Sequence, residues 1–471
     1  MTKMKKVILT LLSVLFLNPQ VNATIFFDSE VDPLPLFSLQ VFIPVGTLSP
    51  DPVQAASMAL YSTVLEDGTE RLTKQEFLDA MMSFGASVSF GSGRDSSSWS
   101  LSFPIIEGKD YEPLIALLEE NWKRPRLTEE TLAKAKVKWN AALKGSLDSD
   151  MRVAASVGRR WLGIQKFGLY PIMTEGLEEA SIDTIKVKAR APLMNPNDIW
   201  AGYIGPDSHK KLAHTILTQV FSRQGEVKEG RLDRSLMLRP RAKEGFGDNK
   251  TAIIVEKTGR TQTIIFTTGV FQDFPRDKNE ELALHFGGHI LGFSGLGSYF
   301  GDEIRNKAGL AYTVSPLQKF YLGKPAVGFL TNPVRAKNDQ TFEVIPNVQT
   351  AAYEEADIFK VLNDEVWERQ WQSFRYGYRL DNSSSGARLA SRRAVVTGEL
   401  SNEFEQTGPE DWKISRGELS SYFRTGWKDS ARVMVFMGES KELRPYIEEN
   451  FPAYEIRVIP VEKTISTQSY K

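Results

Sequence analysis

The chain has no cysteine in its 471 residues. This absence excludes disulfides, cysteine-bound metals, thiol nucleophiles and lipid attachment at cysteine. Histidine is scarce as well, since only four are present and the first 200 residues contain none. A metal site built on two histidines is therefore excluded from that part of the chain. Apolar residues make up 41% of the sequence, which is enough for a large packed core.

An excess of charge of one sign is also missing. Lysine plus arginine number 58 and aspartate plus glutamate number 59, so the formal net charge is −1. Nucleic acids and anionic membranes attract proteins through a basic excess, and we expect neither as a partner. Long apolar runs are lacking after residue 23, so we expect no membrane association once an N-terminal signal has been removed.

The one apolar run near the N-terminus has the features of a secretory signal. It follows three lysines and extends from Val7 to Leu17, which is short for a membrane span. Val21-Asn22-Ala23 then offers small residues at a cleavage site. We predict a signal peptide over residues 1–23 and a periplasmic or secreted mature protein. An uncleaved membrane anchor is the alternative.

The rest of the chain repeats itself. Apolar residues alternate from Phe37 to Val45 and predict a strand, which is followed by predicted helices over 52–65 and 73–84. Thr73 and Glu76 have capping-box spacing at the start of the second of these helices. The same order returns later, with a predicted strand at 264–268, a helix at 279–291, and strands at 312–314, 327–330 and 433–437.

Three landmarks pair across this repeat at nearly equal separations along the sequence: Gly46 with Gly269, Tyr111-Glu112 with Phe342-Glu343, and Gly205 with Gly438. Chance similarity between αβ segments is the alternative, but ordered matches with a small drift favour duplication. We predict domains over 24–225 and 251–465, joined by a charged linker over 226–250. The predicted fold class is α+β, with two homologous two-layer α/β domains, each a mixed or antiparallel sheet with helices on one face.

One segment is specific enough to suggest a family. Residues 291–312 read Leu-Gly-Phe-Ser-Gly-Leu-Gly-Ser-Tyr-Phe-Gly-Asp-Glu-Ile-Arg-Asn-Lys-Ala-Gly-Leu-Ala-Tyr. This resembles the C-terminal domain signature of the pitrilysin (insulinase-like) zinc metallopeptidases, in which a glycine-rich turn leads to an arginine and a tyrosine seven residues apart. Here these are Arg305 and Tyr312. The duplicated two-layer domain is also the unit of that family, so the resemblance covers the mature chain.

The resemblance implies that Arg305 and Tyr312 bind substrate. A guanidinium and a phenol can both donate hydrogen bonds to peptide carbonyls, which orients a peptide without reading its sequence. The alternative is structural, with Arg305 in an ion pair with Asp302 or Glu303 and Tyr312 in the core. The glycines of the segment are better explained by a tight turn than by a phosphate loop, because no Gly-Lys-Ser/Thr follows them.

The zinc motif of the family is absent. Active members carry His-x-x-Glu-His on the first helix, shortly before a Gly-Thr, and a further glutamate some seventy residues on. With Gly68-Thr69 setting the register, the ligand positions fall on Ala59 and Thr63, the base position on Ser62, and the distal glutamate near 133–135. None of these side chains can bind zinc or act as a base near neutral pH. We expect neither catalytic nor metal-binding residues in this chain.

One other set of side chains could mimic a metal site. Glu281, His285 and His289 are spaced four residues apart and would share one face of a helix. No glutamate occupies a base position beside them, and the resembled family holds no metal there. We expect a packed helix with polar edges.

We therefore expect an inactive subunit of a heteromeric zinc peptidase, a pseudoenzyme that orients peptide substrate. The partner would be a homologous subunit that carries the zinc motif, so zinc is expected there and no cofactor in this chain. A non-enzymatic scaffold or peptide-binding protein on the same fold is the second hypothesis. A self-sufficient metallopeptidase is the third, and the missing ligands oppose it.

Overall fold

The structure is a computed structural model, and it describes residues 24–196, 198–221, 227–232, 234–236, 250–273, 275, 277–294, 297–321 and 324–470. The predicted signal peptide, residues 1–23, and most of the predicted linker lie outside the described residues. Within the described ranges, no helix combines the length and the apolar character needed to cross a bilayer.

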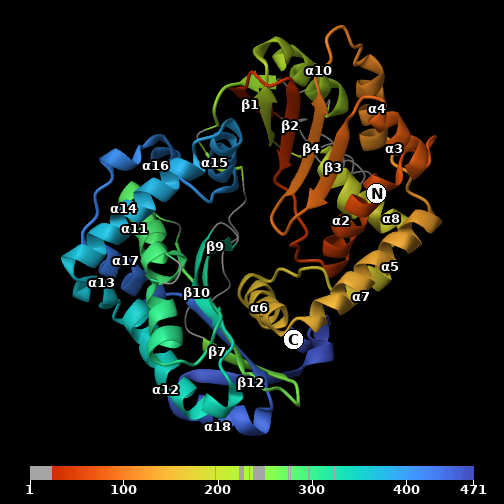
Figure 1. Cartoon of the computed structure of the whole chain (residues 1–471). Helices are drawn as coiled ribbons and strands as arrows, with labels where there is room; N and C mark the ends of the chain where they lie inside the picture. Colours follow the sequence, from red (N-terminus) through yellow and green to blue (C-terminus); the bar gives the residue numbers. More distant parts are fainter. Residues whose placement is uncertain are drawn as a thin grey trace, which may run out of the picture.

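Two six-stranded mixed sheets form the framework (Figure 1). The first has the order β3-β4-β2-β5-β1-β6, in which β1 pairs in parallel with β5 and β6 and the other pairs are antiparallel. Its strands are β1 (Thr24–Val31), β2 (Leu36–Ile43), β3 (Ser87–Ser92), β4 (Ser97–Pro104), β5 (Asp198–Gly205) and β6 (Val227–Glu229).

The second sheet repeats this topology strand for strand. Its order is β9-β10-β8-β11-β7-β12, and β7 pairs in parallel with β11 and β12 as β1 does with β5 and β6. Its strands are β7 (Lys250–Glu256), β8 (Ile264–Val270), β9 (Val314–Tyr321), β10 (Lys324–Thr331), β11 (Ala431–Gly438) and β12 (Tyr454–Pro460). The predicted fold class, two homologous α/β units, is confirmed.

Helices cover one face of each sheet, and a large apolar core lies between each sheet and its helices. In sequence order, the helices of the first half are α2 (Pro52–Val64), α3 (Lys74–Met82), α4 (Glu112–Lys123), α5 (Glu129–Gly145), α6 (Asp150–Trp161), α7 (Thr174–Glu179), α8 (Ile182–Ile185), α9 (Ala191–Met194) and α10 (Lys210–Val220). Those of the second half are α11 (Lys278–Gly288), α12 (Asn338–Gln349), α13 (Ile358–Val361), α14 (Asp364–Asp381), α15 (Ser385–Thr397), α16 (Asn402–Gln406), α17 (Arg416–Lys428) and α18 (Ser440–Asn450).

The two halves exchange one helix each across their other faces. Helix α6 packs on β8 and β11 of the second sheet, where Val153, Val157 and Trp161 join an apolar cluster with strand residues such as Phe266 and Val435. Helix α15 packs on β1 and β5 of the first sheet (Figure 1). By sequence α6 belongs to the first half and α15 to the second, but by packing α6 belongs to the second sheet and α15 to the first.

Ion pairs and the chain end reinforce the exchange. Asp150 at the start of α6 pairs with Lys257 at 2.8 Å and with Arg260, and Arg392 of α15 pairs with Asp28 of β1 at 2.8 Å. After β12 the chain returns to the first half. There the backbone N–H of Thr467 donates to Glu175 at 3.1 Å and the Arg160 guanidinium donates to the Thr464 carbonyl at 2.8 Å.

Several predicted elements have different bounds. The capping box at Thr73 is confirmed, with the backbone N–H of Thr73 donating to Glu76 at 2.8 Å. The repeat landmark Phe342-Glu343 lies inside α12, which begins at Asn338. The strand expected at 312–314 is β9, which starts at Val314 and runs to Tyr321.

Candidate functional site

Helix α2 occupies the place of the zinc-binding helix in the resembled family. Asp51 caps it by accepting a hydrogen bond from the backbone N–H of Val53 at 2.9 Å, and Pro52 opens the first turn. The three positions aligned with the zinc motif, Ala59, Ser62 and Thr63, are all buried. The hydroxyl of Ser62 donates back to the carbonyl of Ala59 at 2.6 Å, so it is already used within the helix.

A tryptophan lies against these positions. The indole Nε1–H of Trp139, on α5, lies 3.0 Å from both the Ala59 carbonyl oxygen and the Thr63 hydroxyl oxygen. At the expected place of the distal glutamate, Ala133 and Lys134 are exposed and Ala135 is buried. The residues present do not fit a zinc ion, because the part of the chain that the structure describes has no metal-binding group of carboxylates and imidazoles here and an indole N–H can only donate.

The possible metal stripe on α11 is a set of separate contacts. Glu281 is fully buried, and its carboxylate accepts hydrogen bonds from the backbone N–H of Ser401 at 2.8 Å and from the Ser401 hydroxyl. Burial raises the pKa of Glu281 to about 7, against the opposing effect of these two hydrogen bonds. This carboxylate therefore anchors the start of α16.

His285 of α11 and His289, the C-cap residue of that helix, line a cavity. Burial lowers the pKa of His285 to about 4 and lowers that of His289 as well, so both rings are neutral near pH 7. The ring of His285 stacks on Phe404 at a centroid distance of 5.3 Å, and its Nδ1 lies 3.3 Å from the Gln318 amide nitrogen. Among the described residues, no group of three or more acidic, histidine or cysteine side chains is placed to hold a metal.

Helices α2 and α11 are equivalent in register. The separation in sequence between their capping residues, Asp51 and Asp277, also relates Ala59 to His285 and Thr63 to His289. The second half thus has histidines at both positions of the absent pair, with Gly288 at the base position. A Cβ at Gly288 would overlap the side-chain amide of Gln318, so this glycine lets β9 approach the helix.

The segment with the proposed substrate-binding pair forms a π-helical turn over Gly301–Lys307, followed by a short loop into β9. Lys307 binds both acidic neighbours, Asp302 at 3.0 Å and Glu303 at 2.6 Å. Arg305 is partly exposed, and its Nε–H donates only to Asn306 at 3.2 Å. In the described part of the chain no carboxylate pairs with Arg305, so the ion pair considered as an alternative is not present.

Tyr312 points into solvent. Its side chain is 89% exposed, which excludes the core position considered as an alternative. The turn before it is closed by Gly309, at a φ of +58°, whose backbone N–H donates to the Arg305 carbonyl at 3.1 Å. Arg305 and Tyr312 are therefore held on either side of one tight turn, and both are left with donors for another molecule.

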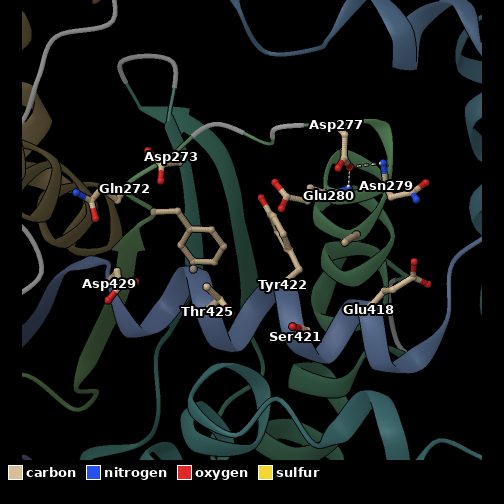
Figure 2. Close-up of a pocket in the computed structure, with 13 residues that line it drawn as sticks. Gln272, Asp273, Asp277, Asn279, Glu280, Glu418, Ser421, Tyr422, Thr425 and Asp429 are labelled. Atoms are coloured by element: carbon tan, nitrogen blue, oxygen red, sulfur yellow. Dashed lines mark hydrogen bonds between the residues drawn. The ribbon is translucent and has the colours of Figure 1, made fainter.

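The sequence did not indicate two cavities. The larger has a volume of about 940 Å³ and lies between α11, β9, α14 and α15, with His285 and His289 in its wall. The smaller, about 420 Å³, lies between α11 and α17 (Figure 2). Five carboxylates line the smaller one, but two of them cap helices: Asp277 binds the first turn of α11, and Glu418 accepts from the Ser415 backbone N–H at 2.7 Å.

Comparison with known proteins identifies the fold. No protein-family model and no curated protein matches the chain. Among solved structures, it is similar to a peptidase M16 inactive domain from Pseudomonas fluorescens, with 17% sequence identity and a TM-score of 0.67 over 89% of this chain and 96% of that one. It is also similar to a protease from Helicobacter pylori, with 15% identity and a TM-score of 0.65 over 87% and 96% of the two chains.

The periplasmic protease PqqL from Escherichia coli is a third similar structure. The identity is 11% and the TM-score 0.65, over 86% of this chain and 43% of PqqL. The chain therefore spans less than half the length of that protease. At these identities the likeness shows a shared fold, which is the fold of M16, pitrilysin-like domains.

Proposed function

We propose that this chain is a non-catalytic subunit of a two-chain zinc peptidase, in which Arg305 and Tyr312 hold the peptide while a homologous partner supplies the metal. The observation that carries the proposal is that both side chains are available to bind another molecule. Arg305 has no carboxylate partner among the described residues, and Tyr312 is 89% exposed. An unpaired guanidinium and an exposed phenol on one rigid turn are suited to binding the carbonyls of another chain.

The zinc position supports the non-catalytic half of the proposal. Trp139 binds the Ala59 carbonyl and the Thr63 hydroxyl, at positions where active relatives need ligands. Peptide cleavage then depends on a second chain, in the periplasm or outside the cell. The partner is a homologue with His-x-x-Glu-His on the helix equivalent to α2.

The test is a mixing experiment with a zinc-motif homologue from the same genome. Alone, the purified chain cleaves no peptide; mixed with the partner, it restores cleavage. Arg305→Ala in the mixture lowers kcat/KM on the order of tenfold to a hundredfold, the value of one or two charge-assisted hydrogen bonds. Arg444→Ala, on the exposed face of α18, and Tyr376→Ala, 64% exposed on α14, are the matched controls for Arg305→Ala and Tyr312→Ala.

A mixture that works normally with Arg305→Ala would disprove the assigned role. A chain that cleaves peptides alone and loses this activity to a chelator would disprove the non-catalytic assignment. The other candidate, a peptide-binding scaffold without a catalytic partner, uses the same exposed pair. It predicts peptide binding that depends on Arg305 and no zinc-motif chain in pull-downs from the native host.

A further inference from the structure

The larger cavity has aromatic walls. Phe293, Phe320, Phe374, Tyr378 and Phe404 contribute to a space of about 940 Å³. Phe293 is 52% exposed, which is unusual for a phenylalanine and places it at the rim. A cavity of this size lies within the range of sites that bind small molecules or several residues of a peptide, roughly 300–1,000 Å³.

Buried polar atoms without partners line the same space. The Nε2 atoms of His285 and His289 are both buried and make no hydrogen bond within the described structure. The Gln318 amide nitrogen lies 3.3 Å from Nδ1 of His285. The two Nε2 atoms are shielded from solvent, so a ligand in the cavity meets other atoms of these rings and the aromatic side chains beside them.

Strand β9 connects the proposed substrate-binding pair to the cavity along the chain. Strand β9 begins shortly after Tyr312, at Val314, and its residues Gln318, Lys319 and Phe320 line the cavity. β9 is the last strand of its sheet, next to β10 only. An extended peptide advances about 3.3 Å per residue, so one that is held at Tyr312 reaches the cavity roughly six to eight residues further along.

We infer that the cavity between α11, β9, α14 and α15 is a specificity pocket for a large aromatic side chain of the bound peptide. The inference rests on the proposed function and adds to it the substrate class, peptides with an aromatic residue several positions from the point held by Arg305 and Tyr312. Aromatic walls favour aromatic occupants through edge-to-face and stacked contacts.

Gly377 of α14 allows the pocket to be filled from within. It lines the cavity, and a Cβ added there would meet no atom within 4 Å. Gly377→Leu therefore projects into the cavity without displacing the core, and it raises the helix propensity of α14. Gly377→Ala is the smaller step. Gly145→Leu is the matched control, since Gly145 lies at the end of α5 and a Cβ there also meets nothing within 4 Å.

The experiment titrates two dodecapeptides into the full chain without its partner and measures Kd by calorimetry. The reference peptide consists of Gly, Ser, Thr and Gln, and the Phe peptide is made as a series in which a single Phe replaces one residue at successive positions. The Phe peptide binds about tenfold or more tightly at one position, as expected from burying one aromatic ring. Gly377→Leu abolishes this preference, leaves the reference peptide's Kd unchanged and does not lower the Tm. Gly377→Ala reduces the preference, and Gly145→Leu retains it.

Four outcomes overturn the inference. One is the absence of any preference for Phe while Arg305→Ala still weakens binding of both peptides, a result that leaves the proposed function standing. Another is that neither peptide binds, in which case the proposed function is decided by the mixing experiment alone. The third is a preference that survives Gly377→Leu in a normally folded protein. The last is binding of N-acetyl-phenylalanine amide as tight as that of the Phe peptide, which would make the cavity a small-molecule site.

Discussion

Glu281 is buried in α11 and holds the start of α16 through Ser401. Its pKa of about 7 in the folded chain lies above the ordinary value of 4.5. The folded state therefore keeps a proton that the unfolded state releases, and the stability that this group contributes is present below pH 4.5 and lost as the pH rises through 7.

The pH dependence isolates this side chain. Raising the pH from 5 to 8 lowers the free energy of unfolding of the wild type by on the order of 2–3 kcal/mol more than it lowers that of Glu281→Gln. Urea unfolding at the two pH values measures the difference. The comparison must be made between variant and wild type, because His285 adds a pH dependence of the opposite sign. Its pKa is lowered to about 4, so the stability that it contributes is lost as the pH falls below 6.5. Equal pH slopes for the two proteins would contradict the burial argument.

At the residue scale, the sequence indicated the missing zinc ligands better than it indicated the side-chain contacts found at their positions. Histidine content alone excluded a two-histidine site from the first 200 residues. The contact of Trp139 with Ala59 joins residues far apart in the sequence and depends on the packing of α5 on α2, which no local pattern encodes. The glycines of the 291–312 segment also differ in role. A Cβ at Gly292 would overlap the ring of Pro316 on β9, whereas one at Gly297 would meet nothing within 4 Å.

At the scale of the element, α15 illustrates how one helix can stabilise a distant sheet. Leu389 is 3% exposed and belongs to a small cluster with Phe42 and Trp200 of the first sheet. Truncating a buried leucine leaves a cavity, so Leu389→Ala lowers the free energy of unfolding by about 2–5 kcal/mol. Leu380→Ala on α14, 75% exposed, changes it by less than about 0.5 kcal/mol. Chemical denaturation measures both, and equal effects would contradict the packing of α15.

Strands near the chain ends and within the linker were the hardest elements to predict. The predicted linker includes β6 and the first residue of β7, and β12 lies beyond the last predicted strand, 433–437. β6 is only Val227–Glu229, too short for a periodic pattern. Helix α15 was missed because its N-cap, Ser384, lies in a serine-rich run that has the composition of a loop.

At the scale of the molecule, the exchange of α6 and α15 makes the halves interdependent. When the halves are expressed as separate polypeptides, 24–236 and 250–471, each lacks the helix that covers its sheet in the intact chain. Apolar strand residues are then exposed to solvent, and each half aggregates. Co-expressed, the two pieces copurify as one complex. Size-exclusion chromatography of the three samples checks this. A soluble, monodisperse single half would show that the exchanged helices are dispensable.

The repeat was visible in the sequence, but the exchange was not. Ordered landmarks at nearly equal separations predicted two equivalent units, and the two sheets share one topology. An amphipathic helix, however, carries no sign of which of two similar sheets it covers. Asp150 of α6 and Arg392 of α15 each form an ion pair with the opposite half, and these ion pairs can be recognised only in the folded structure.

The exchange also imposes an order on biosynthesis. The chain emerges from its N-terminus, and strands β7 to β10 are made after Gly205 ends β5 and before Ser385 begins α15. Until α15 has been made, Phe42 and Trp200 stay uncovered, and strand faces exposed during synthesis are prone to aggregate. The nascent first half is therefore a candidate client for chaperones, and its rate of maturation is set by how quickly the second half arrives.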